Sequence, residues 1–368
     1  MAFLLTPQKE TQDLSNQRTI GIYCHAVTHF VETIAYWVSY NSNIEVTIVT
    51  PEISSHAEHS WGLNRITQYP FGNIEVISPK LENIKSFDRL YIVVNSKDIF
   101  LRKWLNKSKQ IGFLTYSNYK GNWKEKAKEL LRNFPYYLFA ERIGYQTSSS
   151  SKVPYFFIKN QFFYSPSVHP QSIVKDDYRK LMFAPTYNSK KERNFKFSFM
   201  GNRNPPERVP ILKQIKEKLI RDTNIINREQ YLLNQHISNN KNNVLWIEYG
   251  DRDKVRGLSS PDYINALNQT DFCICPLGWG GNWTHRVIES LVRGAIPILE
   301  DGERYNIGLT DMKNCIVVKN NNWLEAIEKA EQINLEQLSS IKSNIAEIRE
   351  KYLLPEAASK KLRESMGL

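Results

Sequence analysis

The sequence predicts an α/β protein with two doubly wound domains that face one another across a cleft. The chain has 368 residues, and about 150 residues per domain would divide it into two domains. Both halves repeat the order strand, turn, helix and strand, which is typical of a parallel sheet covered by helices on both faces. Hydrophobic residues make up 41% of the chain and aromatic residues 12%, enough to fill two soluble cores.

The first domain is expected over residues 19–190, after a loose polar arm of residues 1–18. The nearly continuous apolar run 89–95 predicts a central strand that is buried on both faces. The other elements expected here are strands over 19–26, 44–50 and 74–77 and helices over 30–40 and 124–134. Residues 165–195 combine three prolines with many charges and weak periodicity, so we expect the domain junction at the end of this stretch, near 180–195.

The second domain is expected over residues 191–340. Its opening strand, 195–200, alternates apolar and polar residues and ends at a turn rich in Gly, Asn and Pro. The other elements expected are strands over 244–248, 272–275, 295–299 and 316–318 and helices over 208–219, 262–268, 284–293, 323–333 and 335–352. Ser260 is the expected N-cap of one helix, with Pro261 in its first position. We expect residues 341–368 to form a helical segment that crosses back to the first domain.

The formal net charge of +11 favours an anionic partner. Nucleotides, acidic polysaccharides, phospholipid surfaces and nucleic acids all meet that condition. The densest basic runs, 120–132 and 190–196, are short and belong to no recognisable nucleic-acid-binding module. We therefore expect no nucleic-acid partner.

Four cysteines are too few for a disulfide framework in a chain of this length. Cys273 and Cys275 flank Ile274 in an apolar run, so strand alternation sends both side chains to the same face, where they would pack. A metal or redox site is the alternative, but no second ligand cluster accompanies the pair. No stretch approaches the roughly 20 apolar residues of a membrane-spanning helix. A reduced, cytoplasmic compartment fits these features best, and we expect no metal site.

The sharpest candidate site is a Gly-rich turn between the strand expected at 272–275 and the helix expected at 284–293. Gly278, Gly280 and Gly281 bring bare backbone N–H groups next to a helix N-terminus, and this combination binds anions well. The turn matches neither the dinucleotide fingerprint Gly-x-Gly-x-x-Gly nor a P-loop, because no Gly-Lys-Ser/Thr follows.

The first turn of the following helix adds polar side chains to this anion site. Thr284 supplies a hydroxyl, and His285 and Arg286 supply two potentially cationic groups. A diphosphate would suit this set. Glu289 lies about one turn further along, where a carboxylate can accept hydrogen bonds from ribose or sugar hydroxyls. An intrahelical pair of Glu289 with His285 or Arg286 is the alternative.

Three stretches of the second domain occur in a distinctive order. They read Phe-Cys-Ile-Cys-Pro-Leu-Gly at 272–278, Thr-His-Arg-Val-Ile-Glu-Ser-Leu at 284–291 and Gly-Ala-Ile-Pro-Ile at 294–298. Phe199-Met200-Gly201 and Arg208 precede them. The combination resembles the donor site of the exostosin-like glycosyltransferases, in which Phe-Cys-x-Cys-Pro-x-Gly precedes Ser-x-Arg, a Glu one turn later and Gly-x-x-Pro. Through this match, which spans about 195–320, Gly201 and Arg208 join the donor-binding candidates.

The resemblance implies the GT-B fold of two Rossmann-like domains and a nucleoside-diphosphate sugar donor, usually a uridine one. It also implies transfer that is commonly inverting and needs neither an obligatory metal nor a cofactor. Arg286 and Arg208 would neutralise the leaving diphosphate, and Glu289 would hold donor hydroxyls. Thr284 replaces the usual Ser and keeps its hydroxyl, and His285 would be an additional phosphate donor.

An inverting transfer needs a base that takes the proton of the acceptor hydroxyl, on the N-terminal, acceptor side of the cleft. The candidates, of which at most one is the base, are Asp98, His25, His29 and Glu32. Asp98 follows a strand end and His25 lies at the end of the first strand, whereas His29 and Glu32 lie where the first loop becomes a helix. A surface or capping role is the alternative for each of them.

We therefore expect a glycosyltransferase that extends a surface polysaccharide or glycolipid, in the cytoplasm or peripherally at the inner face of the membrane. Its partners would be a nucleotide-sugar donor and a saccharide or lipid-linked glycan acceptor, and its basic surface would assist contact with anionic acceptors or membrane. Two other functions remain open at this point: a sugar-nucleotide epimerase or hydrolase on the same scaffold, and a non-catalytic protein that binds glycans or nucleotides.

Overall fold

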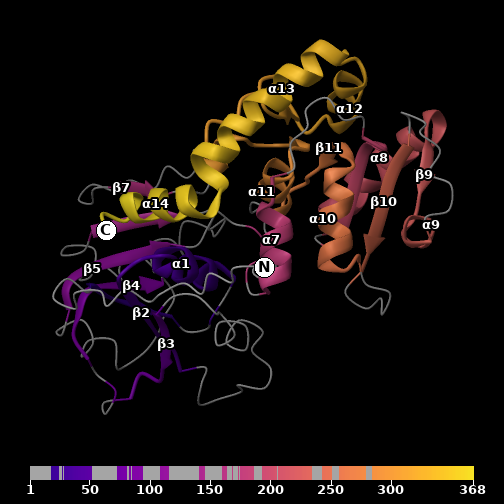
Figure 1. The fold of residues 1–368 in the computed structure, drawn as a ribbon. Helices are drawn as coiled ribbons and strands as arrows, with labels where there is room; N and C mark the ends of the chain where they lie inside the picture. The colour runs from indigo at the N-terminus through magenta and orange to yellow at the C-terminus, as the bar shows by residue number, and fades with distance from the viewer. Residues whose placement is uncertain are drawn as a thin grey trace, which may run out of the picture.

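The computed structural model shows two parallel β-sheets that lie side by side and are covered by helices (Figure 1). It describes residues 18–24, 27, 29–51, 73–80, 83, 85–93, 108–115, 141–145, 160–163, 168, 173, 175–185, 193–204, 206–233, 243–250, 257–278 and 284–368. Two connections join the sheets, one in the middle of the chain and one near its C-terminus. The fold is therefore the α/β arrangement that the alternation of strands and helices predicts.

Among the described residues, the N-terminal sheet has seven strands in the order β3-β2-β1-β4-β5-β6-β7, and all pairs are parallel. The strands are β1 (Arg18–Tyr23), β2 (Ile44–Val49), β3 (Asn73–Ile77), β4 (Phe87–Val93), β5 (Ser108–Thr115), β6 (Glu141–Tyr145) and β7 (Asn160–Phe163). Four consecutive positions are buried at the end of both β1 and β2, so both faces of the sheet are covered there. The strand order reverses between β1 and β4, whose carboxyl ends form a topological switch point.

Helix α1 (His29–Ser39) is apolar on nearly all sides, because it packs against β2 and β3 and is covered by the C-terminal helix α14. Val31, Ile34 and Ala35 are fully buried. The Trp37 ring meets the Phe183 ring edge-on, with centroids 5.9 Å apart. This aromatic contact ties α1 to the connection between the sheets.

The described strands of the C-terminal sheet number six, in the order β13-β12-β11-β8-β10-β9, again all parallel. They are β8 (Phe195–Asn202), β9 (Asn224–Ile226), β10 (Asn243–Tyr249), β11 (Thr270–Ile274), β12 (Ile296–Leu299) and β13 (Ile316–Val317). From β8 the chain first builds one side of the sheet and then, after β10, crosses to the other side at β11. The carboxyl ends of β8 and β11 therefore form the second switch point.

The helices of the C-terminal half follow the strands closely. They are α8 (Arg208–Asp222), α9 (Arg228–Leu232), α10 (Ser260–Asn268), α11 (His285–Val292), α12 (Trp323–Glu331) and α13 (Leu335–Ile348), with the 3-10 helix η4 (Glu303–Tyr305) after β12. The N-cap of α10 is Ser259 and not Ser260, because the Ser259 hydroxyl accepts the hydrogen bond from the Asp262 N–H. Gly294, with φ of 69°, ends α11 in the left-handed conformation that favours glycine.

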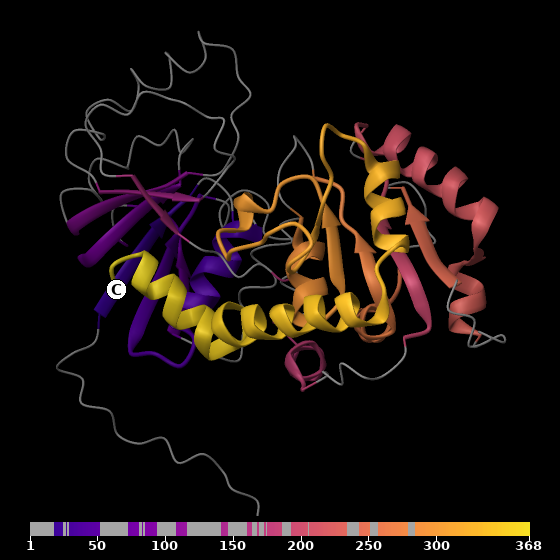
Figure 2. The same cartoon turned by 90° about the horizontal axis from the view of Figure 1, so that it is seen from above.

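The last helices connect the two sheets (Figure 2). Helix α13 continues into the π-helical segment η5 (Arg349–Leu353), and α14 (Pro355–Ser365) then packs against α1. Arg363 Nη1 donates a hydrogen bond to the Tyr40 carbonyl at 3.0 Å, and Tyr91 Oη donates one to the Met366 carbonyl at 3.1 Å. The C-terminal segment thus adds its side chains to the core of the N-terminal sheet.

The stretch expected to be an irregular junction contains a helix, α7 (Asp176–Phe183). Its C-terminal carbonyl groups are bound by two buried arginines from the other half. Arg293 Nη1 donates to the carbonyls of residues 181, 182 and 184, and Arg349 Nη2 donates to those of 183 and 184. Cations stabilise a helix C-terminus, so tertiary contacts complete a helix whose own periodicity is weak. Within the described ranges, no helix is long and apolar enough to cross a membrane.

Candidate functional site: a buried arginine at the switch point of the C-terminal sheet

The expected donor site lies at the carboxyl edge of the C-terminal sheet, between β8 and β11. The chain leaves β8 at Asn202, and the loop after β11 runs through residues 275–278 toward α11. Open parallel sheets bind ligands in the crevice between such loops. Three of the side chains expected in the site, Arg208, Arg286 and Glu289, are buried at this edge.

Arg286, the second residue of α11, is the central cation of the site, and only 7% of it is exposed. Its guanidinium lies over the Phe199 ring, 4.9 Å from the centroid, and its Nε donates to the Met200 carbonyl at 3.1 Å. Nη1 is buried and has no hydrogen-bond partner among the described residues. A buried charged donor without a partner is costly, so Nη1 marks a place where an anionic ligand would be bound.

Gly201 in β8 leaves the space that the guanidinium of Arg286 occupies. A Cβ at this position would lie 1.9 Å from Nη2 and 2.9 Å from Cζ of Arg286. Any side chain here would displace the guanidinium from the Phe199 ring and the Met200 carbonyl. The glycine is therefore needed for close approach.

Arg208, the first residue of α8, holds the two loops of the site together. Its Nη1 donates to the Asn202 carbonyl at 2.9 Å. Its Nε and Nη2 donate to the carbonyls of Leu277 at 2.6 Å and Pro276 at 3.0 Å. Burial, followed by the charge of Arg286, lowers the pKa of Arg208 to about 9. Because carbonyl groups of both loops accept its hydrogen bonds, Arg208 holds the two loops in a fixed relative position.

Glu289 joins α11 to α10. Its Oε2 accepts a hydrogen bond from Tyr263 Oη at 2.7 Å, and only 4% of Glu289 is exposed. Burial, followed by the charge of Glu289, raises the pKa of Tyr263 well above its ordinary value, so this hydroxyl keeps its proton and stays a donor. The contact between helices is one that helical spacing alone does not predict.

The start of α11 is fixed by a third helix. Thr284 is the N-cap, but its side chain makes no capping hydrogen bond. Its backbone N–H donates instead to Tyr305 Oη of η4 at 3.2 Å. His285, the first helical residue, is half-buried beside it. The position of the helix N-terminus, with its partial positive charge, is thus set from outside the helix.

A family model for the exostosin GT47 domain matches residues 136–323, more than half of the chain. The chain belongs to the exostosin GT47 family. The resemblance of the ordered motifs in the C-terminal half is thereby confirmed, and this exostosin GT47 chain is a glycosyltransferase.

Several solved structures are similar to this exostosin GT47 chain. One is a glycosyltransferase from Rickettsia africae, with a TM-score of 0.53 and 14% identity over 95% of this chain and 99% of that one. Another is HepE from Anabaena, solved with UDP-glucose, with a TM-score of 0.52 and 11% identity over the same shares. At such identities the likeness shows the fold, which is GT-B. No curated protein matches the sequence.

The structure describes only one of the remaining glycines that were expected in the donor site. Gly278 is half-buried in the loop after β11, directly after Leu277, whose N–H donates to Glu300 Oε1 at 3.3 Å. Gly280 and Gly281 lie outside the described residues. The structure therefore describes the first glycine of the Gly-rich turn, and the positions of the other two stay a prediction.

On the N-terminal side, Glu32 is the one base candidate whose side chain lies among the described residues. Glu32 lies in the first turn of α1 and is fully buried. His29 is the first residue of α1, but its side chain falls outside the described residues, as do His25 and Asp98 entirely. In this conformation Glu32 exposes no atom to an acceptor. The choice of base therefore stays a prediction.

Sequence reasoning on this GT47 chain missed the tyrosines of the site. Tyr263 and Tyr305 come from α10 and η4, and neither belongs to a motif. Phe199 stands in one of the motifs, but its contact with the Arg286 guanidinium was not predicted. Residues that reach the site from other helices cannot be recognised from the sequence around the motifs.

Cys273 and Cys275 pack as expected in the core of the GT47 domain. Both are completely buried and form no disulfide, and Cys275 Sγ donates to the Cys273 carbonyl at 3.3 Å. Across the described residues, no cluster of His, Cys, Asp and Glu has the geometry to hold a metal ion. The cysteines thus belong to the packing beneath Arg286.

Proposed function

We propose that this GT47 enzyme transfers a sugar from a UDP-sugar to a saccharide or glycolipid acceptor, with inversion of the anomeric configuration. The observation that carries the proposal is the buried Nη1 of Arg286, which lacks a hydrogen-bond partner among the described residues at the switch point of the C-terminal sheet. A diphosphate supplies the charge and the acceptor oxygens that such a donor needs. It also accumulates charge as the glycosyl–phosphate bond breaks, when stabilisation by Arg286 accelerates the reaction most.

The preference for uridine rests on similar structures. HepE from Anabaena, of the same GT-B fold, has been solved with UDP-glucose and with UDP. In the reaction we propose, the acceptor hydroxyl attacks C1 of the sugar, UDP leaves, and a base on the N-terminal side takes the hydroxyl proton. His25, His29, Asp98 and Glu32 are the candidates for that base.

The net charge of +11 supports an anionic acceptor or a peripheral contact with anionic membrane. We propose that the enzyme works in the cytoplasm, at or near the inner face of the membrane. Vesicle sedimentation with and without anionic lipid, at low and high salt, tests this contact. Binding that requires the anionic lipid and decreases with salt is the expected result.

Metal-independent transfer, with no cofactor, also belongs to the proposal, and one sequence feature makes it worth testing. Asp251-Arg252-Asp253 has the Asp-x-Asp spacing of metal-dependent sugar transferases and follows β10, outside the described residues. Activity that persists in EDTA would agree with the proposal. Activity lost in EDTA, restored by Mn²⁺ or Mg²⁺ and abolished in Asp251→Asn would replace it by a metal-assisted transfer.

The experiment that tests the donor site is a thermal-shift panel of nucleoside diphosphates. A ligand bound only by the native state stabilises it by about 2.7 kcal/mol at a concentration of 100 Kd. We expect a shift with UDP that is lost in Arg286→Ala and kept in Arg363→Ala, which removes an arginine on α14 far along the chain from the site. No shift with any nucleotide at millimolar concentration would refute the proposal.

A further inference from the structure

The hydrogen bond between Tyr263 and Glu289 lies between two helices whose starting points are fixed independently. The first turn of α10 is capped by Ser259, whose hydroxyl accepts from the Asp262 N–H and whose carbonyl accepts from the Tyr263 N–H at 2.8 Å. The start of α11 is fixed by Tyr305 through Thr284. The 2.7 Å contact from Tyr263 Oη to Glu289 Oε2 therefore joins two rigid positions.

In this contact the protonated hydroxyl of Tyr263 donates to the buried carboxylate of Glu289. Tyr263 keeps its proton because burial and the charge of Glu289 both disfavour the phenolate. A buried carboxylate needs hydrogen-bond donors to stay ionised, and a hydrogen bond to a charged group is about twice as strong as a neutral one. Without the Tyr263 hydroxyl, Glu289 would lose a donor and a constraint on its rotamer.

Glu289 stands one helical turn from Arg286, which carries the proposed contact to the diphosphate. Arg286 also acts electrostatically on Tyr263. A donor molecule bound through its diphosphate to Arg286 would place ribose and sugar hydroxyls within about one turn of that residue, roughly 5.4 Å along the helix. The direction of the Glu289 carboxylate then decides how well those hydroxyls are bound.

We propose that Tyr263 is a positioning residue of the donor site, which orients the Glu289 carboxylate toward the hydroxyl groups of the nucleotide sugar. The inference rests on the proposed function, because it assigns Glu289 to donor hydroxyls. Tyr263 itself touches the carboxylate and acts on the donor only through it. Its loss lowers affinity for the donor while the fold remains intact.

The test compares Tyr263→Phe with Tyr231→Phe, a matched control. Tyr231 is also a buried tyrosine whose hydroxyl contacts α10, donating to the Asp262 carbonyl and accepting from Asn265 Nδ2, both at 3.3 Å. Binding of UDP and UDP-glucose is measured by calorimetry for the wild type, both tyrosine variants, Glu289→Gln and the double variant Tyr263→Phe/Glu289→Gln. Thermal unfolding without ligand is recorded for each protein.

We expect Tyr263→Phe to weaken binding of UDP or UDP-glucose about tenfold, as the loss of one hydrogen bond to a charged group predicts. Tyr231→Phe binds like the wild type. In the Glu289→Gln background the Tyr263→Phe change has a smaller effect, because the neutral amide oxygen that replaces the carboxylate is a weaker acceptor for the Tyr263 hydroxyl.

Two outcomes overturn the inference. In the first, Tyr263→Phe binds UDP and UDP-glucose with the same affinity as the wild type. The other is an equal loss of affinity in both backgrounds, which would show that Tyr263 acts independently of Glu289. A wild-type protein that binds no nucleotide would instead refute the proposed function, so the two failures are distinguishable.

Discussion

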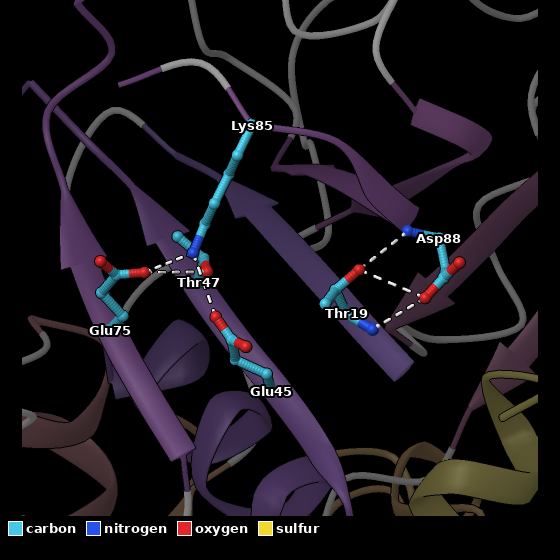
Figure 3. Close-up of polar contacts among 6 residues, drawn as sticks. All are labelled: Thr19, Glu45, Thr47, Glu75, Lys85 and Asp88. Atoms are coloured by element: carbon cyan, nitrogen blue, oxygen red, sulfur yellow. Dashed lines mark hydrogen bonds and ion pairs between the residues drawn. The ribbon is translucent and has the colours of Figure 1, made fainter. Parts of the chain in front are cut away.

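Both sheets of this GT47 enzyme carry a polar cluster, but the two clusters differ in place and in pairing. In the N-terminal sheet, Lys85 binds Glu45 and Glu75 near the amino ends of the strands, and Thr19 binds Asp88 beside them (Figure 3). Lys85 and Glu45 are about one-third exposed, and Glu75 is half exposed. In the C-terminal sheet, Arg208, Arg286 and Glu289 are almost completely buried at the carboxyl edge.

The difference separates polar groups that support a fold from those that we propose bind the donor. Every dashed contact of the N-terminal cluster joins one charged or polar group to another (Figure 3). Lys85, Glu45 and Glu75 are also partly exposed, so water reaches these ions. In the C-terminal cluster, Arg286 is buried with an Nη1 that no described residue binds. A buried donor without a partner is energetically unfavourable, and a bound molecule that accepts its hydrogen bond would offset this cost. The four predictions below test this separation, beginning with the largest effect.

The sharpest test uses one glycine from each central strand, Gly201 in β8 and Gly21 in β1. A Cβ on Gly201 would lie 1.9 Å from the guanidinium of Arg286, whereas one on Gly21 would lie 2.7 Å from Leu90 and Phe87. We expect Gly201→Ala to weaken UDP binding at least tenfold, a loss of about 1.4 kcal/mol or more. Gly21→Ala should lower the melting temperature and leave the affinity for UDP unchanged. If Gly21→Ala weakened UDP binding and Gly201→Ala did not, the proposed difference between the two sheets would be wrong.

Replacement of Arg208 by lysine should affect stability and binding together. The single ammonium group of a lysine cannot donate hydrogen bonds to the carbonyls of Asn202, Pro276 and Leu277 in the geometry of the guanidinium. Each buried carbonyl left without a donor costs about 1–3 kcal/mol. We expect a lower free energy of unfolding in urea and weaker UDP binding. Arg286→Lys is the contrasting variant, with the larger loss of binding. A stable Arg208→Lys protein that fails only to bind UDP would indicate direct contact with the diphosphate.

Asp311 tests a paired charge in the C-terminal half. Burial opposes its ionisation, but the hydrogen bonds from Lys329 at 2.6 Å and the Val317 N–H at 2.9 Å outweigh it, so its pKa lies below the ordinary 3.8. The ionised form thus stabilises the fold at neutral pH, and this contribution is lost as the pH falls below 3.8. Asp311→Asn should reduce stability by about 1 kcal/mol at pH 7, the net contribution of a typical hydrogen bond.

The pH dependence supplies the control for Asp311. Urea unfolding of the wild type and Asp311→Asn should give curves that converge as the pH is lowered toward 3. A constant difference from pH 7 to pH 3 would mean that the ionisation of Asp311 is not what stabilises the fold. UDP binding at pH 7 should be the same for both proteins.

The smallest effect is expected for Lys85→Ala in the N-terminal cluster. Exposed ion pairs contribute about 0–1 kcal/mol, and salt screens them. We expect a destabilisation within this range that shrinks in 1 M NaCl, with no change in UDP binding. A larger and salt-independent loss, measured by urea unfolding at both salt concentrations, would mean that the Lys85 ion pairs are less solvated than the exposed fractions of their side chains indicate.

Much of the fold could be predicted from local pattern. The expected strands at 44–50, 244–248 and 316–318 agree with β2, β10 and β13 to within one residue at each end. Their apolar runs are strong and their ends are marked by turns. β5, β6 and β7 were missed, because 108–115, 141–145 and 160–163 are short or mixed in polarity and pair only within a large sheet.

The candidate site divides in the same way. Arg286, Glu289 and Gly201 stand in ordered motifs, and the structure places them at one switch point. Which partner each group uses was not readable, since Glu289 binds Tyr263 of another helix and Arg208 binds the carbonyls of two loops. Partners that are distant in sequence leave no trace in the spacing of a motif.

The sequence by itself determined the α/β class, the parallel order of strand and helix in the C-terminal half and the family of its donor motifs. These follow from hydrophobic period, turn residues and a fixed order of short motifs, all of which are local. The tertiary structure alone decided that Gly201 makes room for the Arg286 guanidinium, that Arg293 and Arg349 complete α7, and that Tyr263 faces Glu289. Burial and hydrogen bonding depend on the whole fold, because only packing brings elements that are distant in the chain within bonding distance.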